Sequence, residues 1–288
     1  MGYLHINNLY KDQTILMCRE CYALEKIHGT SAHIRWDGQK IGLFSGGAPH
    51  DRFVALFDRE LLAGQLRELF GDRRITIYGE AYGGKIQGMR ATYGEALRFV
   101  AFDVSVGRGW LNVPEAEKIV LGVGLEFVAY KRVATDVDAL NKERDRPSVQ
   151  AVRNGIEEPR PREGVVLRPI EELRKQNGER LIAKHKAAEF CETKTPRAVN
   201  AAAAQILQDA RAVADEWVTE MRLTHVLDKF PGASVEQTGG VIKAMIADVC
   251  REGEGEFEDS RAVRAAIGKR TAQLFHRRLR SALAEVGA

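Results

Sequence analysis

The sequence has few cysteines and no long apolar segment, and each absence argues against a class of protein. Its four cysteines fit a reducing compartment. Cys18 and Cys21 form a CxxC pair, but no second such pair follows, which argues against a zinc ribbon and favours cysteines packed as small apolar side chains. Because no run reaches ~18 apolar residues, no membrane span is expected. The N-terminus lacks the basic and apolar regions of a signal peptide, and we expect a cytoplasmic protein.

The composition is that of a soluble globular protein, with 44% hydrophobic and 29% charged residues. The net charge is only +3, but from Ser260 onward the chain holds seven basic residues against one acidic residue. A basic cluster on one helix fits the phosphate backbone of a nucleic acid, and it fits a solvated helix face equally well. The basic residues are Arg261, Arg264, Lys269, Arg270, Arg277, Arg278 and Arg280.

Hydrophobic periodicity divides the chain into a mixed region and a helical region. A helical spacing of apolar residues predicts a helix over 51–70, ended by Gly71. The proline-rich, charged stretch 144–162 is expected to be a solvent-facing connection. After Thr193 the chain is rich in alanine with helical periodicity, so we expect a mixed domain over 1–193 and a helical domain over 194–288. Short strands are predicted over 14–17, 22–27, 32–36, 40–44, 74–79, 97–106, 125–133, 164–168 and 180–184.

Start signals divide the helical region further. Pro196 can begin a helix that runs to about residue 222. Ser234 and Gln237 form a capping-box pattern ahead of a second helix that ends near Cys250. Asp259 or Ser260 is expected to cap a last helix.

A lysine near the N-terminus stands where two predicted strands meet. It belongs to the stretch Glu25-Lys26-Ile27-His28-Gly29-Thr30, which precedes an alternating run over 32–36. Gly29 permits a tight turn or the close approach of a ligand to the backbone. A lysine in such a place is most often a solvated surface charge. Its role therefore depends on the residues that accompany it.

Four further stretches follow the lysine stretch in order: Gly79-Glu80, Val100-Ala101-Phe102-Asp103, Glu163-Gly164-Val165-Val166-Leu167-Arg168 and Ile182-Ala183-Lys184-His185-Lys186. Together the five stretches resemble motifs I, IIIa, III, IV and V of the covalent nucleotidyltransferase superfamily of ligases and capping enzymes. Within that superfamily the chain looks most like the ATP-dependent RNA ligase 2-like family. The resemblance spans about residues 26–186. The helical last third is also similar to that family, whereas DNA ligases and capping enzymes usually carry an OB-fold there.

The resemblance implies a fold, an activity and ligands. The fold would be α+β, with an antiparallel-sheet, ATP-grasp-like nucleotidyltransferase domain followed by an all-helical domain that is a candidate for RNA binding. The activity would be ATP-dependent joining of RNA 3′-OH and 5′-phosphate ends through lysyl-AMP and RNA-adenylate intermediates. The cofactors would be ATP and Mg²⁺ or Mn²⁺. The partners would be RNA ends, such as a nicked duplex or a 3′-OH strand, and we expect a monomer.

The same resemblance makes Lys26 the nucleophile that attacks the α-phosphate of ATP. The amine must be neutral to attack, and neighbouring cations disfavour its protonated form. Lys184 and Lys186 stand two apart on a predicted strand and share one face, where both can approach the triphosphate. Without the other motifs, this pair would be an ordinary exposed basic strand face.

The remaining roles concern the nucleotide and its metal. By resemblance Glu163 would position a hydrated Mg²⁺, since hard cations prefer carboxylate oxygens. Phe102 would stack on one face of adenine and Val166 on the other, although an aromatic in an apolar strand is otherwise a core residue. Glu80 would accept a hydrogen bond from the ribose. The site would be completed by Glu25 and Ile27, with Asp103 in a structural role.

Three positions depart from the family pattern. Ser31 stands where asparagine is common, and Arg168 stands where lysine is more usual. The stretch 43–47, Leu-Phe-Ser-Gly-Gly, lacks an arginine that in the family helps to hold phosphate groups. Arg35 and Arg52 are candidates to replace it. Two alternatives therefore stay open: a DNA ligase of the same chemistry, and a degenerate nucleotide- or RNA-binding protein of the same fold.

Overall fold

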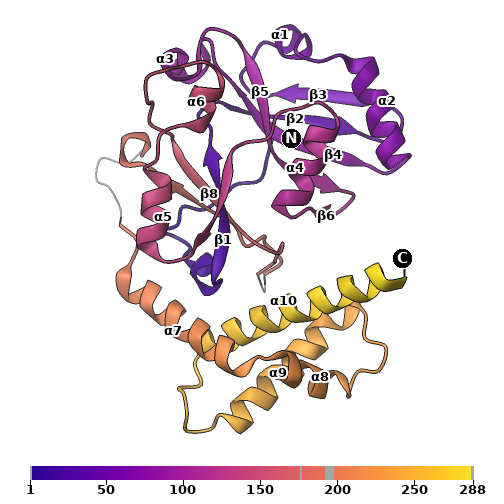
Figure 1. Ribbon diagram of the computed structural model, residues 1–288, viewed down its shortest axis with the longest axis vertical. Coiled ribbons are helices and arrows are strands. Elements are labelled where there is room, and N and C mark those ends of the chain that lie inside the picture. The colour runs from indigo at the N-terminus through magenta and orange to yellow at the C-terminus, as the bar shows by residue number, and fades with distance from the viewer. Residues whose placement is uncertain (1, 176, 192–197, 287–288) are drawn as a thin grey trace. The chain divides into compact units, whose positions relative to one another are not determined.

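The computed structural model describes residues 2–175, 177–191 and 198–286, and the side chains of the last helix as far as residue 282. The chain forms two compact units: Met1–Ile15 with Glu20–Ala198, and Leu16–Arg19 with Val199–Ala288 (Figure 1). The expected domain boundary at residues 193 and 194 lies outside the described residues, as does Pro196. In the part of the chain that the structure describes, no helix has both the length and the apolar character to cross a membrane.

The first unit contains two antiparallel sheets. One has the strand order β7–β1–β8–β9 and the other the order β3–β2–β4–β5–β6. The strands are β1 (Glu20–Lys26), β2 (Thr30–Trp36), β3 (Ile41–Ser45), β4 (Ile75–Tyr82), β5 (Arg98–Val106), β6 (Gly109–Trp110), β7 (Tyr130–Ala134), β8 (Gly164–Pro169) and β9 (Ala183–Lys186). The antiparallel α+β architecture expected for this part of the chain is confirmed.

Short helices surround the sheets of the first unit. The α-helices are α1 (His50–Val54), α2 (Arg59–Phe70), α3 (Arg90–Tyr93), α4 (Val113–Gly122), α5 (Val137–Arg144) and α6 (Val149–Arg153), and the 3₁₀ helices are η1 (Thr14–Met17), η2 (Ile86–Gly88) and η3 (Ala188–Phe190). Helix α2 covers Trp36, whose indole Nε1 donates a hydrogen bond of 2.8 Å to the carbonyl of Gly71. Buried residues of α1, α2 and α4 join the inward side chains of β2, β4 and β5 in one apolar core.

The two sheets are connected next to Lys26. Strand β1 ends at Lys26 in one sheet, and β2 begins at Thr30 in the other. At Gly29, between them, an added Cβ would lie 2.4 Å from the carbonyl oxygen of Ala81. Only glycine fits so close to a neighbouring strand, and this close approach brings the end of β1 against β4.

Among the elements expected in the first unit, three differ from the structure for a local reason. The segment 14–17 is the 3₁₀ helix η1, because the carboxylate of Asp12 accepts a hydrogen bond from the amide of Thr14 and starts a turn. The helix expected over 51–70 is two helices, because the carboxylate of Asp58 caps the start of α2. The strand expected over 125–133 begins only at Tyr130, because the amide of Val128 bonds to the carbonyl of Ala101 instead.

A buried charge network joins the two sheets. Asp103 on β5 is fully buried, and its two carboxylate oxygens lie 2.9 Å from Arg168 Nη1 on β8 and 2.6 Å from Arg180 Nη1. Glu172 accepts from both guanidinium groups. The Tyr3 hydroxyl donates to the Asp103 carboxylate. Because Arg168 is itself 1% exposed, each charge of the network depends on its partners for solvation.

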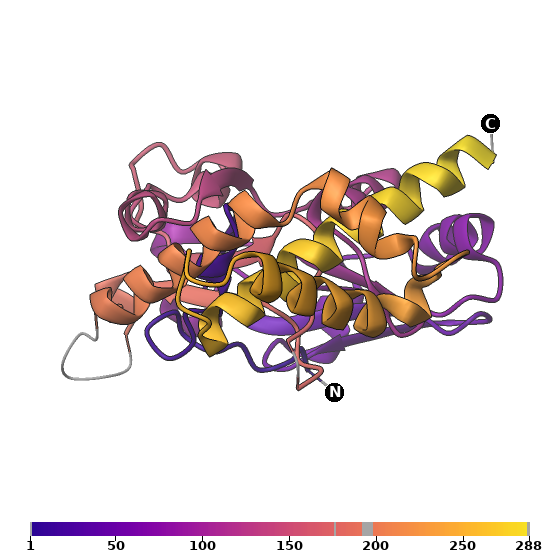
Figure 2. The same ribbon diagram turned by 90° about the horizontal axis from the view of Figure 1, so that it is seen from below.

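The regular elements of the second unit are all helices within its described residues. Its helices are α7 (Ala201–Trp217), α8 (Glu220–Leu227), η4 (Val235–Gln237), α9 (Thr238–Glu252) and α10 (Arg261–Val286). The helix expected to run to about residue 222 ends at Trp217, and α8 follows it. Helix α10 lies alongside α7 and α9 (Figures 1 and 2), and apolar residues of all four α-helices form one core. The capping box of Ser234 and Gln237 is present, and the Ser260 hydroxyl accepts from the amide of Val263 at the start of α10. The helical character expected for this region is confirmed.

The network makes a prediction about stability. The substitution Asp103→Ala should lower the free energy of unfolding by about 3–5 kcal/mol, since it leaves two buried guanidinium groups without their shared carboxylate. Urea unfolding followed by circular dichroism measures the loss. Glu20→Ala is the control, because it removes a carboxylate that is 41% exposed from its pair with Arg132 and should change the same quantity by less than about 1 kcal/mol. Equal losses in the two variants would contradict a structural role for Asp103.

Candidate active site

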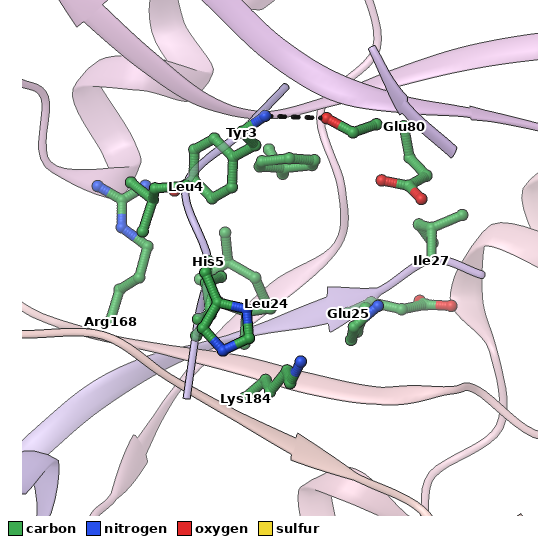
Figure 3. Close-up of a pocket in the computed structure, with 14 residues that line it drawn as sticks. Tyr3, Leu4, His5, Leu24, Glu25, Ile27, Glu80, Arg168 and Lys184 are labelled. Atoms are coloured by element: carbon green, nitrogen blue, oxygen red, sulfur yellow. Dashed lines mark hydrogen bonds between the residues drawn. The ribbon is translucent and has the colours of Figure 1, made fainter. Parts of the chain in front are cut away.

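A cavity of about 380 Å³ lies between the two sheets of the first unit (Figure 3). One wall comes from β1, β8 and β9, and the facing wall from β2, β4 and β5. The residues predicted for the site that line it are Glu25, Lys26, Ile27, Glu80, Phe102, Val166 and Lys184. The other two do not line the cavity: Glu163 is paired with Lys26 of the cavity wall, and Lys186 is paired with Glu163.

Glu163 lies beside the cavity, and its carboxylate contacts two lysines and a histidine. Its Oε2 accepts a hydrogen bond of 2.7 Å from Lys26 Nζ, and its Oε1 lies 3.1 Å from Lys186 Nζ. The ring Nδ1 of His28 lies 3.1 Å from Oε2. Burial alone would raise the pKa of Glu163, but Lys26 and Lys186 outweigh it and hold the pKa below its usual value. Glu163 is therefore an ionised carboxylate shared by two lysines.

Strand pairing explains why these residues meet. In the register of β1, β8 and β9, Lys26 pairs with Gly164 and Gly164 pairs with Lys186. Gly164 has a φ of +146°, and a Cβ there would lie 2.2 Å from the carbonyl oxygen of His185, so this tight crossing requires glycine. Lys184 pairs with Val166 and shares the face of Lys186. The side chain of His185 is aimed away from both, toward Asn141 and Arg144.

The opposite wall carries an acid with a shifted pKa. Glu80 on β4 lines the cavity and receives a hydrogen bond from the amide of Gly29. Burial raises the pKa of Glu80 to about 7, a shift that Lys26 opposes and Glu163 reinforces. Near neutral pH, Glu80 thus exchanges between an acceptor-only carboxylate and a carboxylic acid that can donate.

Phe102 and Val166 belong to facing sheets and both line the cavity. The Phe102 ring meets the ring of Tyr3 edge-on, with centroids 4.9 Å apart and planes at 79°. Neither side chain is fully buried. A flat ring could therefore be received between an aromatic face and a β-branched side chain.

Glu25 lines the cavity, but its carboxylate is already engaged. It accepts hydrogen bonds from the Ser148 hydroxyl at 2.6 Å and from the amides of Val149 and Gln150 at 2.9 and 3.3 Å. These donors begin helix α6, so the carboxylate caps that helix. Because Ser148, Gln150 and Ala151 are buried, the expectation that 144–162 is a solvent-facing connection is wrong. Part of that segment supports the strand that carries Lys26.

The N-terminal segment forms a wall of the cavity that sequence reasoning missed. Tyr3, Leu4, His5 and Ile6 line it, and the Tyr3 amide donates a hydrogen bond of 3.2 Å to the Ser31 hydroxyl, drawn as a dashed line in Figure 3. The segment is held in place further along, where Asn8 pairs with Lys184 in parallel. Such a long-range pairing leaves no local pattern in the sequence. Arg168 departs from the family pattern, but its place in the cavity wall was also missed.

The metal-binding capacity of the described residues is small. Among them, no group of three or more His, Cys, Asp and Glu side chains could hold a metal ion. Glu163 offers one ionised carboxylate beside the cavity. That donor set suits a Mg²⁺ ion that keeps several waters and is held mainly by substrate phosphates, and it does not suit a dedicated protein cage.

The sequence as a whole was also compared with known proteins. A sequence model described as RNA ligase matches residues 19–186, which include Lys26, Glu163 and Lys186. The chain belongs to the RNA ligase family. No curated protein matches the chain.

Solved RNA ligase structures share the fold. A Naegleria gruberi RNA ligase mutant with AMP and Mn matches with a TM-score of 0.51 at 15% identity, over 66% of this chain and 57% of that one. Another mutant of that ligase with ATP and Mn, and the ligase with PPi, match with the same TM-score and coverage at 16% identity. The chain therefore spans 57% of the length of these RNA ligases, and the likeness is one of fold.

The shifted pKa of Glu80 makes stability depend on pH. The carboxyl titrates near 4.5 when unfolded and at about 7 when folded, so its ionisation opposes folding and stability is lost as the pH rises between these values. Glu80→Gln removes this loss. We expect the variant to gain about 3 kcal/mol in free energy of unfolding relative to the native protein between about pH 4 and pH 8. Denaturant unfolding at several pH values, with the exposed Glu60→Gln as a control expected to show no such gain, measures the difference.

Proposed function

We propose that this protein is an ATP-dependent RNA ligase that captures AMP on Lys26 and delivers it to an RNA end. The observation that carries the proposal is the placement of the Lys26 amine at the wall of the cavity, paired with a carboxylate that Lys186 shares. The Naegleria ligases with AMP, ATP, Mn and PPi support it, since these are a nucleotide donor, a metal and a product of such a reaction.

In the first step Lys26 loses a proton to solvent, and its nitrogen forms a bond to the α-phosphorus of ATP. The bond from that phosphorus to the bridging oxygen breaks, and a second proton leaves the nitrogen. Pyrophosphate leaves. Lys184 and Lys186 would offset the negative charge that develops on the phosphate oxygens. Mg²⁺ or Mn²⁺, positioned by Glu163 through water, would supply further neutralisation of the triphosphate.

The base would lie between Phe102 and Val166 beside Ile27, and the ribose would hydrogen-bond to Glu80. In this proposal Glu25 does not bind the nucleotide through its carboxylate. The carboxylate instead caps the start of α6 and so fixes the end of β1, which carries Lys26. In the second step an oxygen of an RNA 5′-phosphate forms a phosphoanhydride bond to the phosphorus of AMP. The bond from that phosphorus to the Lys26 nitrogen breaks, and the nitrogen takes up a proton. In the third, an RNA 3′-hydroxyl attacks that phosphate, forms the phosphodiester and releases AMP.

Adenylylation tests the first step. Incubation with α-labelled ATP and Mg²⁺ should attach label to the native protein, and Lys26→Ala should abolish it. Lys26→Arg keeps a cation beside Glu163 but lacks a nucleophilic amine, so it should fold normally and remain unlabelled. Lys40→Ala, at an exposed position, should label like the native protein. Native protein that takes no label would sink the proposal.

Sealing of duplex nicks separates this activity from its alternatives. An RNA ligase should join a nick with an RNA 3′-OH strand faster than one with a DNA 3′-OH strand. The reverse preference would indicate a DNA ligase of the same chemistry. Label that forms on Lys26 and never reaches any nucleic acid would indicate a degenerate binding protein.

We further propose that the end of α10 binds the RNA backbone. Arg277, Arg278 and Arg280 are exposed near the end of α10, and Arg278 donates to the Thr224 hydroxyl. Arg264, also exposed, is paired with Asp259. Replacing Arg277, Arg278 and Arg280 with alanine should weaken RNA binding and reduce the slope of log K against log salt by about 0.7–0.9 for each phosphate that the variant no longer binds. Filter binding over a salt series measures the slope. Arg251→Ala, which removes a cation paired with Asp248, should leave it unchanged.

A further inference from the structure

One face of the second sheet carries side chains that the proposed reaction does not use. Strand β2 directs alternate residues to this face, which begins with Ser31 at the cavity and continues with His33 and Arg35. On β4 the paired residues are Glu80, Tyr78 and Thr76 in the same order. The face therefore runs without interruption from the cavity wall outward along the strands.

Aromatic rings cross this face from strand to strand. We call Phe44 on β3, His33 on β2, Tyr78 on β4 and Trp110 on β6 the aromatic row. Phe44 and His33 stack with centroids 5.0 Å apart and planes at 24°, and His33 lies 5.9 Å from Tyr78. Tyr78 and Trp110 follow at 5.3 Å and 34°. Each ring of the row is half-buried, so each keeps an accessible part.

The aromatic row is joined to the cavity through Tyr3. The Tyr3 ring contacts Tyr78 at 5.2 Å and Trp110 at 5.7 Å, and it also contacts Phe102 in the cavity wall. Arg180 lies over Trp110 at 4.0 Å. These contacts fix the inner rings, while Phe44 and His33 form the outer end of the row.

The chemistry of this face fits unpaired bases better than an apolar partner. At the outer end of the row, the Phe44 ring packs on His33 and keeps an accessible part, to which a base of any sequence could be added by stacking, as in single-strand RNA-binding sheets. His33, Tyr78 and Trp110 also carry polar atoms, which a purely apolar surface would not. Arg35, exposed on the same face, supplies positive charge for a phosphate. The row also includes Phe44, from the stretch that lacks the expected arginine.

We propose that the aromatic row binds unpaired bases of the RNA strand whose end is joined, adjacent to the cavity that receives the nucleotide. This inference rests on the proposed ligase function. It specifies the substrate class as RNA with unpaired nucleotides near the joined end, because bases in a fully paired duplex have no free faces to stack on the row.

Two ligands and two variants test the proposal in the full-length protein. Phe44→Leu keeps an apolar side chain but removes the ring, and Phe44→Trp restores a stacking surface. For an unpaired RNA oligonucleotide, Phe44→Leu should raise the Kd by about 5- to 100-fold, and Phe44→Trp should bind like the native protein. For an abasic oligonucleotide with the same phosphates, the native protein and Phe44→Leu should bind equally. Phe57→Leu, which alters a ring packed on Phe53 away from the row, is the control.

The outcomes distinguish a stacking role of the aromatic row from altered folding and from failure of the ligase proposal. Equal weakening of both ligands by Phe44→Leu would indicate altered folding or charge and would overturn the stacking role, as would no weakening of either. Label from α-labelled ATP on Lys26, measured in the same samples, reads the proposed ligase chemistry separately. Absence of label from every sample would refute the ligase proposal, whereas normal label with unchanged RNA binding would refute the aromatic row alone.

Discussion

The connection between the two sheets of the first unit depends on the carboxylate of Asp103. It accepts from Arg168 on one sheet and from Arg180, while it stands itself on the other sheet, so the two walls of the cavity meet at one buried anion. The neighbouring residue in β5, Phe102, lines the cavity opposite Val166 in β8. Tyr3 joins the same anion and brings the N-terminal segment to the cavity wall. A buried charge network thereby supports the walls of the cavity in which we propose that the nucleotide binds.

Charged and apolar side chains both contribute to the cavity. Lys26 lines it and belongs to an ionic cluster with Glu163 and Lys186, which lie beside it. Phe102, Val166 and Ile27 supply apolar lining. Glu80 lines the same cavity, where burial raises the pKa of its carboxyl and Lys26 opposes the shift. A lining of both kinds suits the proposed ligand, which joins a flat base to phosphates.

The motif residues could be located from the sequence, and the structure brings most of them to one cavity, because glycine stands at positions that local geometry constrains. At Gly29 and Gly164 an added Cβ would lie less than 2.5 Å from a backbone oxygen, so only glycine fits there. A required glycine near a lysine or a glutamate can be recognised in the sequence. Features that arise from distant contacts could not be predicted. The cap that Glu25 places on α6, the pairing of Asn8 with Lys184 and the position of Tyr3 all join residues far apart in the chain. The capping residue Asp58 is a local signal for the start of α2, but the apolar periodicity that continues across it favoured a single helix.

The short link between β1 and β2 has a consequence for how a ligand in the cavity is bounded. Only Ile27, His28 and Gly29 separate the two strands, and Gly29 touches β4, so the sheets cannot spread apart along that edge. The link therefore holds the two sheets together along this edge of the cavity. The opposite side of the cavity is bounded by the segment 3–6, which is tied to both sheets by side-chain hydrogen bonds and by the pairing of Asn8 with Lys184. A ligand in the cavity is therefore bounded by the β1–β2 link and by a segment from the start of the described chain.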